Sequence, residues 1–312
     1  MQSYSLTAAA KINLYLEIIG ARPDGYHNLA MILQSIDLAD QIDLRPLNTN
    51  AICLHCDHPE VPQDHTNLAY KAAALMAENF SDAFSKFGGV DITIEKRIPV
   101  GAGLAGGSTN AAAVLVGLNL MWDLKLSEEK LQYFGSLLGS DVPFCITGGT
   151  VLATEKGESL SALPPLNNSY LVIGKYRSLS ISTTWAYQTF HHQYLKDDAI
   201  AANQQQKVNL EKMRSAIDRQ NEQQIGQLLY NDLERVVLPQ YQQVQRLRDE
   251  FQRLGCAGMM SGSGPSVFAL TNSKTQAQQV VESIKIAIPD PDLELWISQF
   301  TSSSIRIASL LK

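Results

Sequence analysis

A glycine-rich loop that runs into a helix is the segment of this sequence best suited to chemistry. It extends from Pro99 to Trp122 and reads PVGAGLAGGSTNAAAVLVGLNLMW. Its glycines let the backbone approach a ligand closely, and the Ala- and Leu-rich residues after Ser108 and Thr109 favour a helix. The loop N–H groups and the positive end of the helix dipole then converge on one point. The segment therefore predicts a phosphate-binding site.

Three familiar phosphate loops do not fit this segment. A P-loop needs a Lys beside the Ser/Thr, but Gly107 precedes Ser108 and no Lys lies in the loop. A dinucleotide-binding loop needs a second strand that ends in an acidic residue about twenty positions on, whereas Asp123 directly follows the helix. A protein-kinase glycine loop lies between two strands. A glycine turn that only caps a buried helix remains an alternative.

Two alanines, Ala102 and Ala105, interrupt the glycines of this loop. Residues with a Cβ rarely adopt a positive φ. We therefore expect a negative φ at both positions and an unstrained loop at these points.

The composition is that of a globular protein with a sizeable core. The chain has 312 residues, of which 45% are hydrophobic and 18% charged, and this length predicts about two domains. A net charge of −6 argues against nucleic acid or an anionic membrane surface as partner. The N-terminal segment has no basic region, and Lys11 interrupts its only apolar run. We expect a cytoplasmic protein, a monomer or weak homodimer, with small-molecule ligands.

The cysteines raise the question of a metal site. Cys53 and Cys56 have zinc-ligand spacing within the sequence CLHCDH, but no second Cys or His pair follows at a suitable distance. The segment has the pattern of a strand and a turn, which favours solvated polar residues over zinc.

The apolar pattern of the first half predicts several strands and helices around the loop. A long strand or a hairpin is expected at residues 4–19, and a further hairpin within 40–62. Strands are expected at 30–38, 90–95 and 148–154, and helices at 64–80 and 127–138. In the first strand Ile12, Leu14 and Leu16 share one face, while Lys11, Asn13, Tyr15 and Glu17 share the other. A strand Lys is most often a solvated edge residue, so this alternative applies to Lys11.

Two turns place polar side chains where they can reach a ligand. The turn from Arg22 to Gly25 presents Tyr26 and His27 at the start of the next strand. Asp141 lies between a helix end and Pro143, on a loop from which its side chain can reach a pocket. Its alternative role is to bind local backbone.

The second half begins after a Pro- and Asn-rich stretch at 163–169, which predicts a boundary between domains 1–160 and 161–312. A strand at 169–176 is followed by a Gln-rich stretch at about 197–207, which we expect to be a mobile surface insertion. Helices are expected at 209–220, 222–236, 240–254 and 274–287. Strands flank a Gly/Ser turn within 255–271, and a last strand is expected at 293–300. This order predicts an α+β domain of split βαβ type.

The loop pattern P-x-x-x-G-L-x-G-G-S-S/T resembles the second motif of the GHMP kinases, the galactose, homoserine, mevalonate and phosphomevalonate kinase superfamily. Three further segments, AKINLYLEIIGARPDGYHNL, GSDVPF and SGSGPSVFAL, occur in the order and spacing of one branch of it. That branch phosphorylates a cytidine diphosphate-linked methylerythritol in the non-mevalonate isoprenoid pathway. The resemblance covers residues from about 8 to 300. It implies the two-domain α+β GHMP kinase fold, with an N-terminal domain like ribosomal protein S5 domain 2 and a C-terminal ferredoxin-like domain.

The resemblance also implies roles, with ATP and Mg²⁺ as cofactors. Lys11 and Asp141 match the catalytic pair, in which Asp141 accepts the proton of the acceptor 2-hydroxyl and Lys11 orients it and favours its ionised form. The ATP-binding positions are Pro99, Val100, Gly101, Ala102, Gly103, Leu104, Ala105, Gly106, Gly107, Ser108 and Thr109. The third motif comprises Ser261, Gly262, Ser263 and Gly264 within the sequence SGSGPS. The cytidine-binding positions are Asn13, Tyr26, His27, Thr183 and Tyr187.

Two alternatives stay open within this resemblance. One is a GHMP kinase with another acceptor, such as homoserine or a phosphorylated mevalonate. Tyr26 and His27 argue against it, because those acceptors have no base to stack. The other is a catalytically silent nucleotide-binding member, against which the presence of both Lys11 and Asp141 argues. Ser108 is a plausible Mg²⁺ contact.

Overall fold

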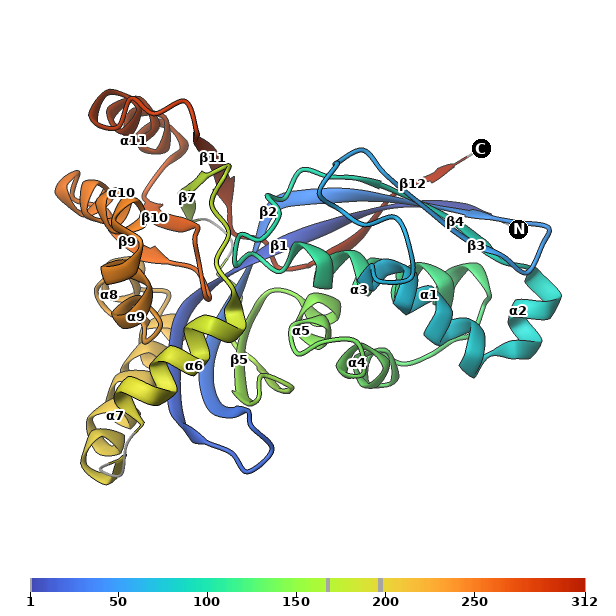
Figure 1. The fold of residues 1–312 in the computed structure, drawn as a ribbon, viewed down its shortest axis with the longest axis horizontal. Helices are drawn as coiled ribbons and strands as arrows, with labels where there is room; N and C mark the ends of the chain where they lie inside the picture. The colour runs from blue at the N-terminus through green and yellow to red at the C-terminus, as the bar shows by residue number, and fades with distance from the viewer. Residues whose placement is uncertain (1, 167–168, 196–198, 312) are drawn as a thin grey trace.

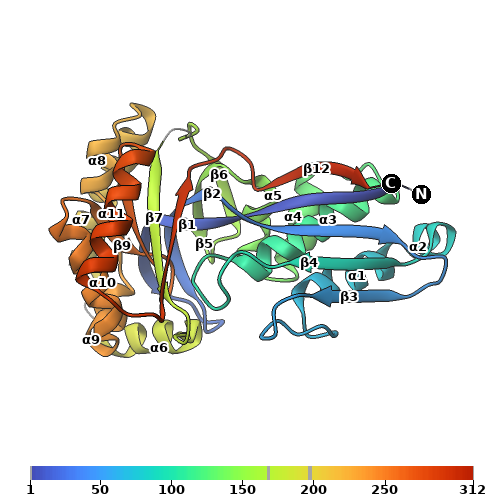
Figure 2. The same cartoon turned by 90° about the horizontal axis from the view of Figure 1, so that it is seen from above.

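The computed structural model describes residues 2–166, 169–195 and 199–311. Within these ranges the chain forms two sheets with helices packed against them (Figures 1 and 2). The larger sheet has eight described strands, with the order β12–β1–β2–β4–β3, β5 and β6 continuing from β2, and β8 beside β1. Its strands are β1 (Ser3–Ala21), β2 (His27–Pro46), β3 (Ile52–Cys56), β4 (Val90–Glu95), β5 (Thr150–Glu155), β6 (Ser159–Ala162), β8 (Tyr230–Asn231) and β12 (Ile305–Leu311).

Helices from the first half of the chain cover one face of this sheet, as Figure 1 shows. They are α1 (Leu68–Asn79), α2 (Ser81–Phe87), α3 (Gly106–Met121), α4 (Glu128–Ser136) and α5 (Val142–Thr147). The Asn67 side chain caps α1 by accepting a 2.8 Å hydrogen bond from Ala69 N, and the Ser127 hydroxyl caps α4. α3 is buried on most of its surface, so the helix that follows the glycine loop lies at the centre of this layer.

The smaller sheet has the order β11–β7–β10–β9 among the described residues. Its strands are β7 (Tyr170–Tyr176), β9 (Ala257–Met260), β10 (Val267–Thr271) and β11 (Leu293–Gln299). The helices of the second half are α6 (Thr183–Tyr194), α7 (Ala199–Asp218), α8 (Glu222–Gln227), α9 (Glu234–Gln240), α10 (Gln242–Arg253) and α11 (Lys274–Ala287). α11 has the bounds that the sequence predicts, and the strand, Gly/Ser turn and strand at 255–271 are also confirmed.

The end of the chain returns to the larger sheet, which the sequence does not predict. β12 pairs antiparallel with β1 (Figure 2). β8 pairs with β1 in parallel at Tyr15 and Leu16. β1 is therefore an interior strand that both halves of the chain help to hold. The second half of the chain therefore contributes strands to both sheets. The domain boundary expected at residue 160 stays a prediction.

The hairpin expected within residues 40–62 is wrong. β2 continues unbroken to Pro46, and β4 takes the place beside it by pairing antiparallel from Gln41 onward. β3 then pairs in parallel with β4. Parallel pairing needs a long crossover, and the segment that contains α1 and α2 supplies it.

The expected faces of β1 are wrong beyond Leu14. The register with β2 shifts between Asn13 and Tyr15. Such a bulge adds one residue and moves the side chains after it to the opposite face. Tyr15 therefore packs with Ile12 in one core cluster, and Leu16 packs in the other.

One helix expectation in the second half also needs correction. The predicted helix at 222–236 is divided, because Tyr230 and Asn231 pair with β1 as β8 between α8 and α9. The helix expected at 209–220 begins earlier, because the backbone of residues 199–207 is the first part of α7. The expectation of a mobile surface insertion in this stretch stays a prediction. Residues 197 and 198 of that expected insertion lie outside the described residues. None of the helices in the described ranges combines the length and apolar character needed to cross a bilayer.

Candidate active site

A cavity of about 790 Å³ lies between the glycine loop, β1, the start of α6 and the Gly/Ser turn after β9. The structure brings most of the predicted site residues to its wall. These are Lys11, Asn13, Tyr26, His27, Asp141, Thr183, Tyr187, Gly262, Ser263 and the loop from Pro99 to Gly107. Ser108, Thr109, Ser261 and Gly264 are outside this lining. The individual roles of all these residues stay predictions.

The glycine loop turns sharply into α3 at Ala105. This residue has φ +58°, in the left-handed region, so the expected negative φ at Ala105 is wrong. A left-handed residue with a Cβ costs about 1–2 kcal/mol, a strain found at functional sites. No side chain caps α3, which begins at Gly106, and both Gly106 and Gly107 line the cavity. The first amides of a buried helix therefore face the space where an anion would bind.

Gly103 joins the loop to the third motif. A Cβ at Gly103 would lie 2.3 Å from Ser261 O, so this contact requires glycine. The Gly103 carbonyl accepts hydrogen bonds from the Ser261 hydroxyl at 3.1 Å and from Lys11 Nζ at 3.2 Å. Asn231 holds the same turn from β8, because its Nδ2 donates to Met260 O and Gly262 O at 2.8 Å each.

Lys11 and Asp141 meet on the wall of the cavity. Lys11 Nζ lies 3.9 Å from Asp141 Oδ2 and donates to Asn13 Oδ1 at 2.8 Å, which confirms that Lys11 and Asn13 share a face. Lys11 is only 5% exposed on an interior strand, so a solvated edge is excluded. Asp141 precedes α5 without a capping hydrogen bond from its side chain. Its carboxylate is therefore available to a ligand.

Aromatic and imidazole side chains gather at another part of the cavity. Tyr26 is 62% exposed on the turn after β1. His27 is buried, with its ring centroid 5.6 Å from that of Tyr187, and its Nε2 lies 3.3 Å from His191 Nδ1 on α6. Burial, and then the neighbouring His191, lower the pKa of His27. The ring is therefore neutral at pH 7, with one nitrogen as donor and the other as acceptor.

Two further contacts connect the elements around the part of the cavity that contains Tyr26 and His27. Thr183 Oγ1 at the start of α6 lies 2.8 Å from Ser263 Oγ of the third motif. Lys156 Nζ lies 3.3 Å from Asp24 Oδ2 and 5.1 Å from the centroid of the Tyr26 ring. Lys156 also lines the cavity. Neither Lys156 nor His191 is predicted from the sequence, because no local pattern marks either residue.

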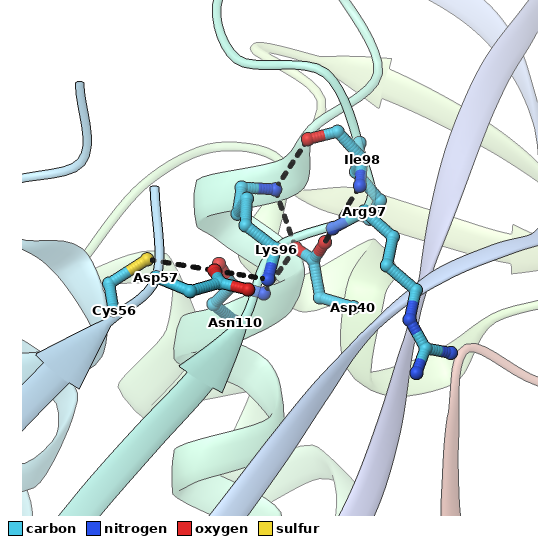
Figure 3. A network of polar contacts seen from close by, with 7 residues as sticks. All are labelled: Asp40, Cys56, Asp57, Lys96, Arg97, Ile98 and Asn110. Atoms are coloured by element: carbon cyan, nitrogen blue, oxygen red, sulfur yellow. Dashed lines mark hydrogen bonds and ion pairs between the residues drawn. The ribbon is translucent and has the colours of Figure 1, made fainter. Parts of the chain in front are cut away.

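A polar network at the other end also escaped the sequence analysis (Figure 3). Lys96 and Asn110 line the cavity, and both bind the buried carboxylate of Asp40. A Cβ at Gly106 would lie 2.9 Å from Lys96 Nζ. A lysine therefore does reach the loop, from the chain just after β4 rather than from the loop itself. Its position directly before the loop, at the end of a strand, is the only sequence signal for it.

The cavity continues from Lys96 to the segment between β3 and α1 and to the start of α1, where Val61, Pro62 and Leu68 supply apolar surface. The strand predicted at the CLHCDH sequence is confirmed as β3, on which Cys53 is exposed. Within the described ranges, no group of three or more His, Cys, Asp or Glu side chains could hold a metal ion.

Family comparisons agree with this combination of fold and cavity. Residues 67–149 match the model of the GHMP kinases N terminal domain, and residues 213–290 match that of the GHMP kinases C terminal. The first match contains the glycine loop and Asp141, and the second contains the third motif. The fold and the site thus define a small-molecule kinase of the GHMP class.

Individual relatives narrow the class. A 4-diphosphocytidyl-2-C-methyl-D-erythritol kinase of Trichodesmium erythraeum is 56% identical over 99% of this chain and 100% of its own length. The enzyme of that name from Nostoc punctiforme is 56% identical over 99% of each chain. The chain belongs to the 4-diphosphocytidyl-2-C-methyl-D-erythritol kinase family.

Solved structures show the same fold. A crystal structure of 4-(cytidine 5'-diphospho)-2C-methyl-D-erythritol kinase superposes with a TM-score of 0.72 and 29% identity, covering 95% of this chain and 98% of that one. Homoserine kinase from Cytophaga hutchinsonii gives a TM-score of 0.76 at 19% identity, covering 98% and 97%. At that identity the second likeness concerns the fold alone.

Proposed function

We propose that this kinase transfers the γ-phosphoryl group of ATP to the 2-hydroxyl of 4-diphosphocytidyl-2-C-methyl-D-erythritol. The observation that carries the proposal is the meeting of Lys11 and Asp141 with the amide end of α3 in one cavity. The full-length relatives named for this activity support the same acceptor over homoserine or phosphomevalonate.

ATP occupies the end of the cavity formed by the loop in this proposal. The N–H groups at Gly106 and Gly107 bind its phosphates, and Lys96 adds a positive charge beside them. The apolar surface of Val61 and Leu68 receives the adenine. Because the net charge of the chain is −6, this local geometry, rather than a general positive field, attracts the anion.

Asp141 acts as the general base. The acceptor oxygen forms a bond to the γ-phosphorus while the bond from that phosphorus to the bridging oxygen of ATP breaks, and ADP leaves. The hydroxyl proton passes to the Asp141 carboxylate, which Lys11 orients from 3.9 Å. Lys11 itself is fixed by Asn13 and the Gly103 carbonyl, so the catalytic pair is tied to the phosphate loop.

Mg²⁺ accompanies ATP in this proposal. In kinase sites Mg²⁺ is held mainly by substrate phosphates and water, with few protein ligands, so the phosphates at the glycine loop would supply most of its coordination. Bound with ATP, the ion offsets negative charge on the phosphates. Ser108 lies outside the cavity lining and stays a candidate contact only.

The cytidine of the acceptor binds at the aromatic end. Tyr26 and Tyr187 supply faces for stacking, which is worth about 1–3 kcal/mol per base. The neutral His27 ring and the Asn13 amide read the hydrogen-bonding edge of the base, and Thr183 lines the same end. A cytoplasmic location and a monomeric or weakly dimeric state remain predictions from the sequence.

A panel of acceptors tests this function. ADP release is measured by a coupled assay with the cytidine compound, homoserine and phosphomevalonate as separate acceptors. We expect turnover with the cytidine compound alone. Turnover of homoserine or phosphomevalonate at a comparable kcat/KM would reject the proposed acceptor, and ATP binding without turnover of any acceptor would favour a silent nucleotide-binding protein.

A further inference from the structure

We propose that Asp40 is a positioning residue that holds the nucleotide end of the cavity in the geometry that binds ATP. Asp40 lies on β2, is fully buried and does not line the cavity. It therefore acts only through the groups that it binds. This inference rests on the proposed ATP site.

The Asp40 carboxylate binds two separate parts of the chain, residues 96–98 and Asn110 (Figure 3). Oδ1 accepts hydrogen bonds from the backbone N–H groups of Arg97 at 2.7 Å and Ile98 at 2.8 Å. Oδ2 accepts from Lys96 Nζ at 2.6 Å and from Asn110 Nδ2 at 2.8 Å. One buried charge thus joins β2, the segment that leads into the glycine loop, and α3.

These contacts fix the groups that face the nucleotide. Lys96 uses one N–H for Asp40 and a second for Ile98 O at 2.8 Å, and an ammonium group has three. Its Nζ lies next to Gly106, where α3 begins. The Lys96 side chain is only 5% exposed, and a buried ammonium is costly without a partner. Asp40 therefore holds the Lys96 ammonium group in place before ATP arrives.

A purely structural role for Asp40 is the competing explanation. In that case the carboxylate only satisfies the backbone N–H groups of Arg97 and Ile98, and ATP affinity follows overall stability. The two roles differ in which substitution is tolerated. Asp40→Asn keeps the shape and one acceptor oxygen but turns an amide donor toward Lys96 Nζ. Asp40→Glu keeps the charge and alters the shape.

The test measures the dissociation constant of ATP by calorimetry on the full chain, without acceptor. We expect Asp40→Asn to raise it at least tenfold, with KM for the cytidine acceptor changed less than twofold. Asp40→Glu should retain more ATP affinity than Asp40→Asn. Glu95→Gln is the matched control, because it breaks the exposed ion pair of Glu95 with Arg97 in the same segment and should change nothing.

A double-variant cycle tests whether Asp40 acts through Lys96. If it does, Asp40→Asn combined with Lys96→Met should bind ATP no more weakly than Lys96→Met alone. Folding of each variant is checked by circular dichroism. The inference would be overturned if folded Asp40→Asn bound ATP with wild-type affinity, or if Asp40→Asn bound ATP more tightly than Asp40→Glu. It would also be overturned if the losses of ATP affinity in the two single variants added independently in the double variant. Unchanged ATP affinity in Lys96→Met would instead reject the proposed nucleotide site, and this inference with it.

Discussion

The two ends of the cavity are built in different ways. The nucleotide end is the part around the glycine loop and Lys96, and the acceptor end is the part around Tyr26 and His27. At the nucleotide end, the buried Asp40 carboxylate accepts four hydrogen bonds, and the Gly103 carbonyl binds both Lys11 and Ser261. At the acceptor end, Tyr26 is mostly exposed on a turn, held by the partly exposed pair of Asp24 and Lys156. Exposed ion pairs contribute little, typically about 0–1 kcal/mol.

This difference indicates that the two ends of the cavity have different functions. In the proposed function, the many hydrogen bonds at the nucleotide end hold the loop in place, so that less binding energy is needed to order it. The acceptor end, which contacts the cytidine in that proposal, is the selective end. Asp141 and Lys11 lie where the two ends meet. Changes at the nucleotide end should therefore alter ATP affinity, and changes at the acceptor end should alter acceptor KM.

The largest effect on activity is expected at Asp141, which lies where the two ends of the cavity meet. Asp141→Asn keeps the shape of the side chain but cannot accept the hydroxyl proton, so kcat should fall about 100-fold or more while ATP affinity stays nearly constant. Steady-state kinetics and calorimetry provide the two values. Asp123→Asn is a control, since Asp123 is an exposed Asp paired with Lys125. More than a tenth of wild-type kcat in Asp141→Asn would exclude a general-base role.

The next effect tests the rigidity of the nucleotide end. Gly106→Val places a side chain where a Cβ would be 2.9 Å from Lys96 Nζ, so Lys96 must move. Loss of a hydrogen bond to a charged group costs about 1.5–3 kcal/mol, or at least tenfold in the Kd of ATP. Gly107→Ala is the matched control, because its nearest neighbour would be a Leu68 methyl at 3.7 Å. Equal ATP affinity in both variants would show that the position of Lys96 does not affect ATP binding.

The selectivity of the acceptor end is tested by Tyr26→Ala. Loss of one stacking face should raise KM for the cytidine acceptor about 5- to 150-fold and leave KM for ATP unchanged. Tyr133→Ala, at a similarly exposed tyrosine on α4, controls for the loss of an exposed aromatic ring. A parallel rise in both KM values would argue that the two ends are not separate.

The smallest effect concerns pH. The pKa of His27 is lowered by burial and by His191, so the folded site favours the neutral ring. Its contribution is present above the ordinary histidine pKa of about 6.5 and is lost as the pH falls through the lowered value. KM for the acceptor should therefore rise in mildly acidic solution, by up to about tenfold per pH unit once His27 is protonated. KM profiles from pH 5 to 8 measure this, and an identical rise for ATP would point to a different group.

Local patterns in the sequence predicted the elements that depend on local physics. The glycine loop before α3, the bounds of α11 and the shared face of Lys11 and Asn13 follow from periodicity and turn chemistry. The roles in the site came from motif resemblance, since nothing local separates Asp141 from an ordinary turn residue.

Contacts between distant residues set the features that the sequence did not predict. Asp40 and Lys96 are 56 positions apart, and His27 and His191 are 164 apart, so no spacing rule connects them. The left-handed Ala105 is imposed by the approach of the loop to α3 against its own preference. β12 is not predicted from the sequence, because its half-exposed residues Ile307 and Leu310 give little alternation of apolar and polar residues.

The selectivity for a cytidine-linked acceptor is measured most directly by one ratio of kcat/KM values. The kcat/KM value is measured with the cytidine compound and with methylerythritol phosphate, which lacks the base. A site that is built to hydrogen-bond a group of its substrate rejects an analogue that lacks this group by about 10⁴. We predict a ratio of that order, and equal kcat/KM for the two acceptors would contradict the account.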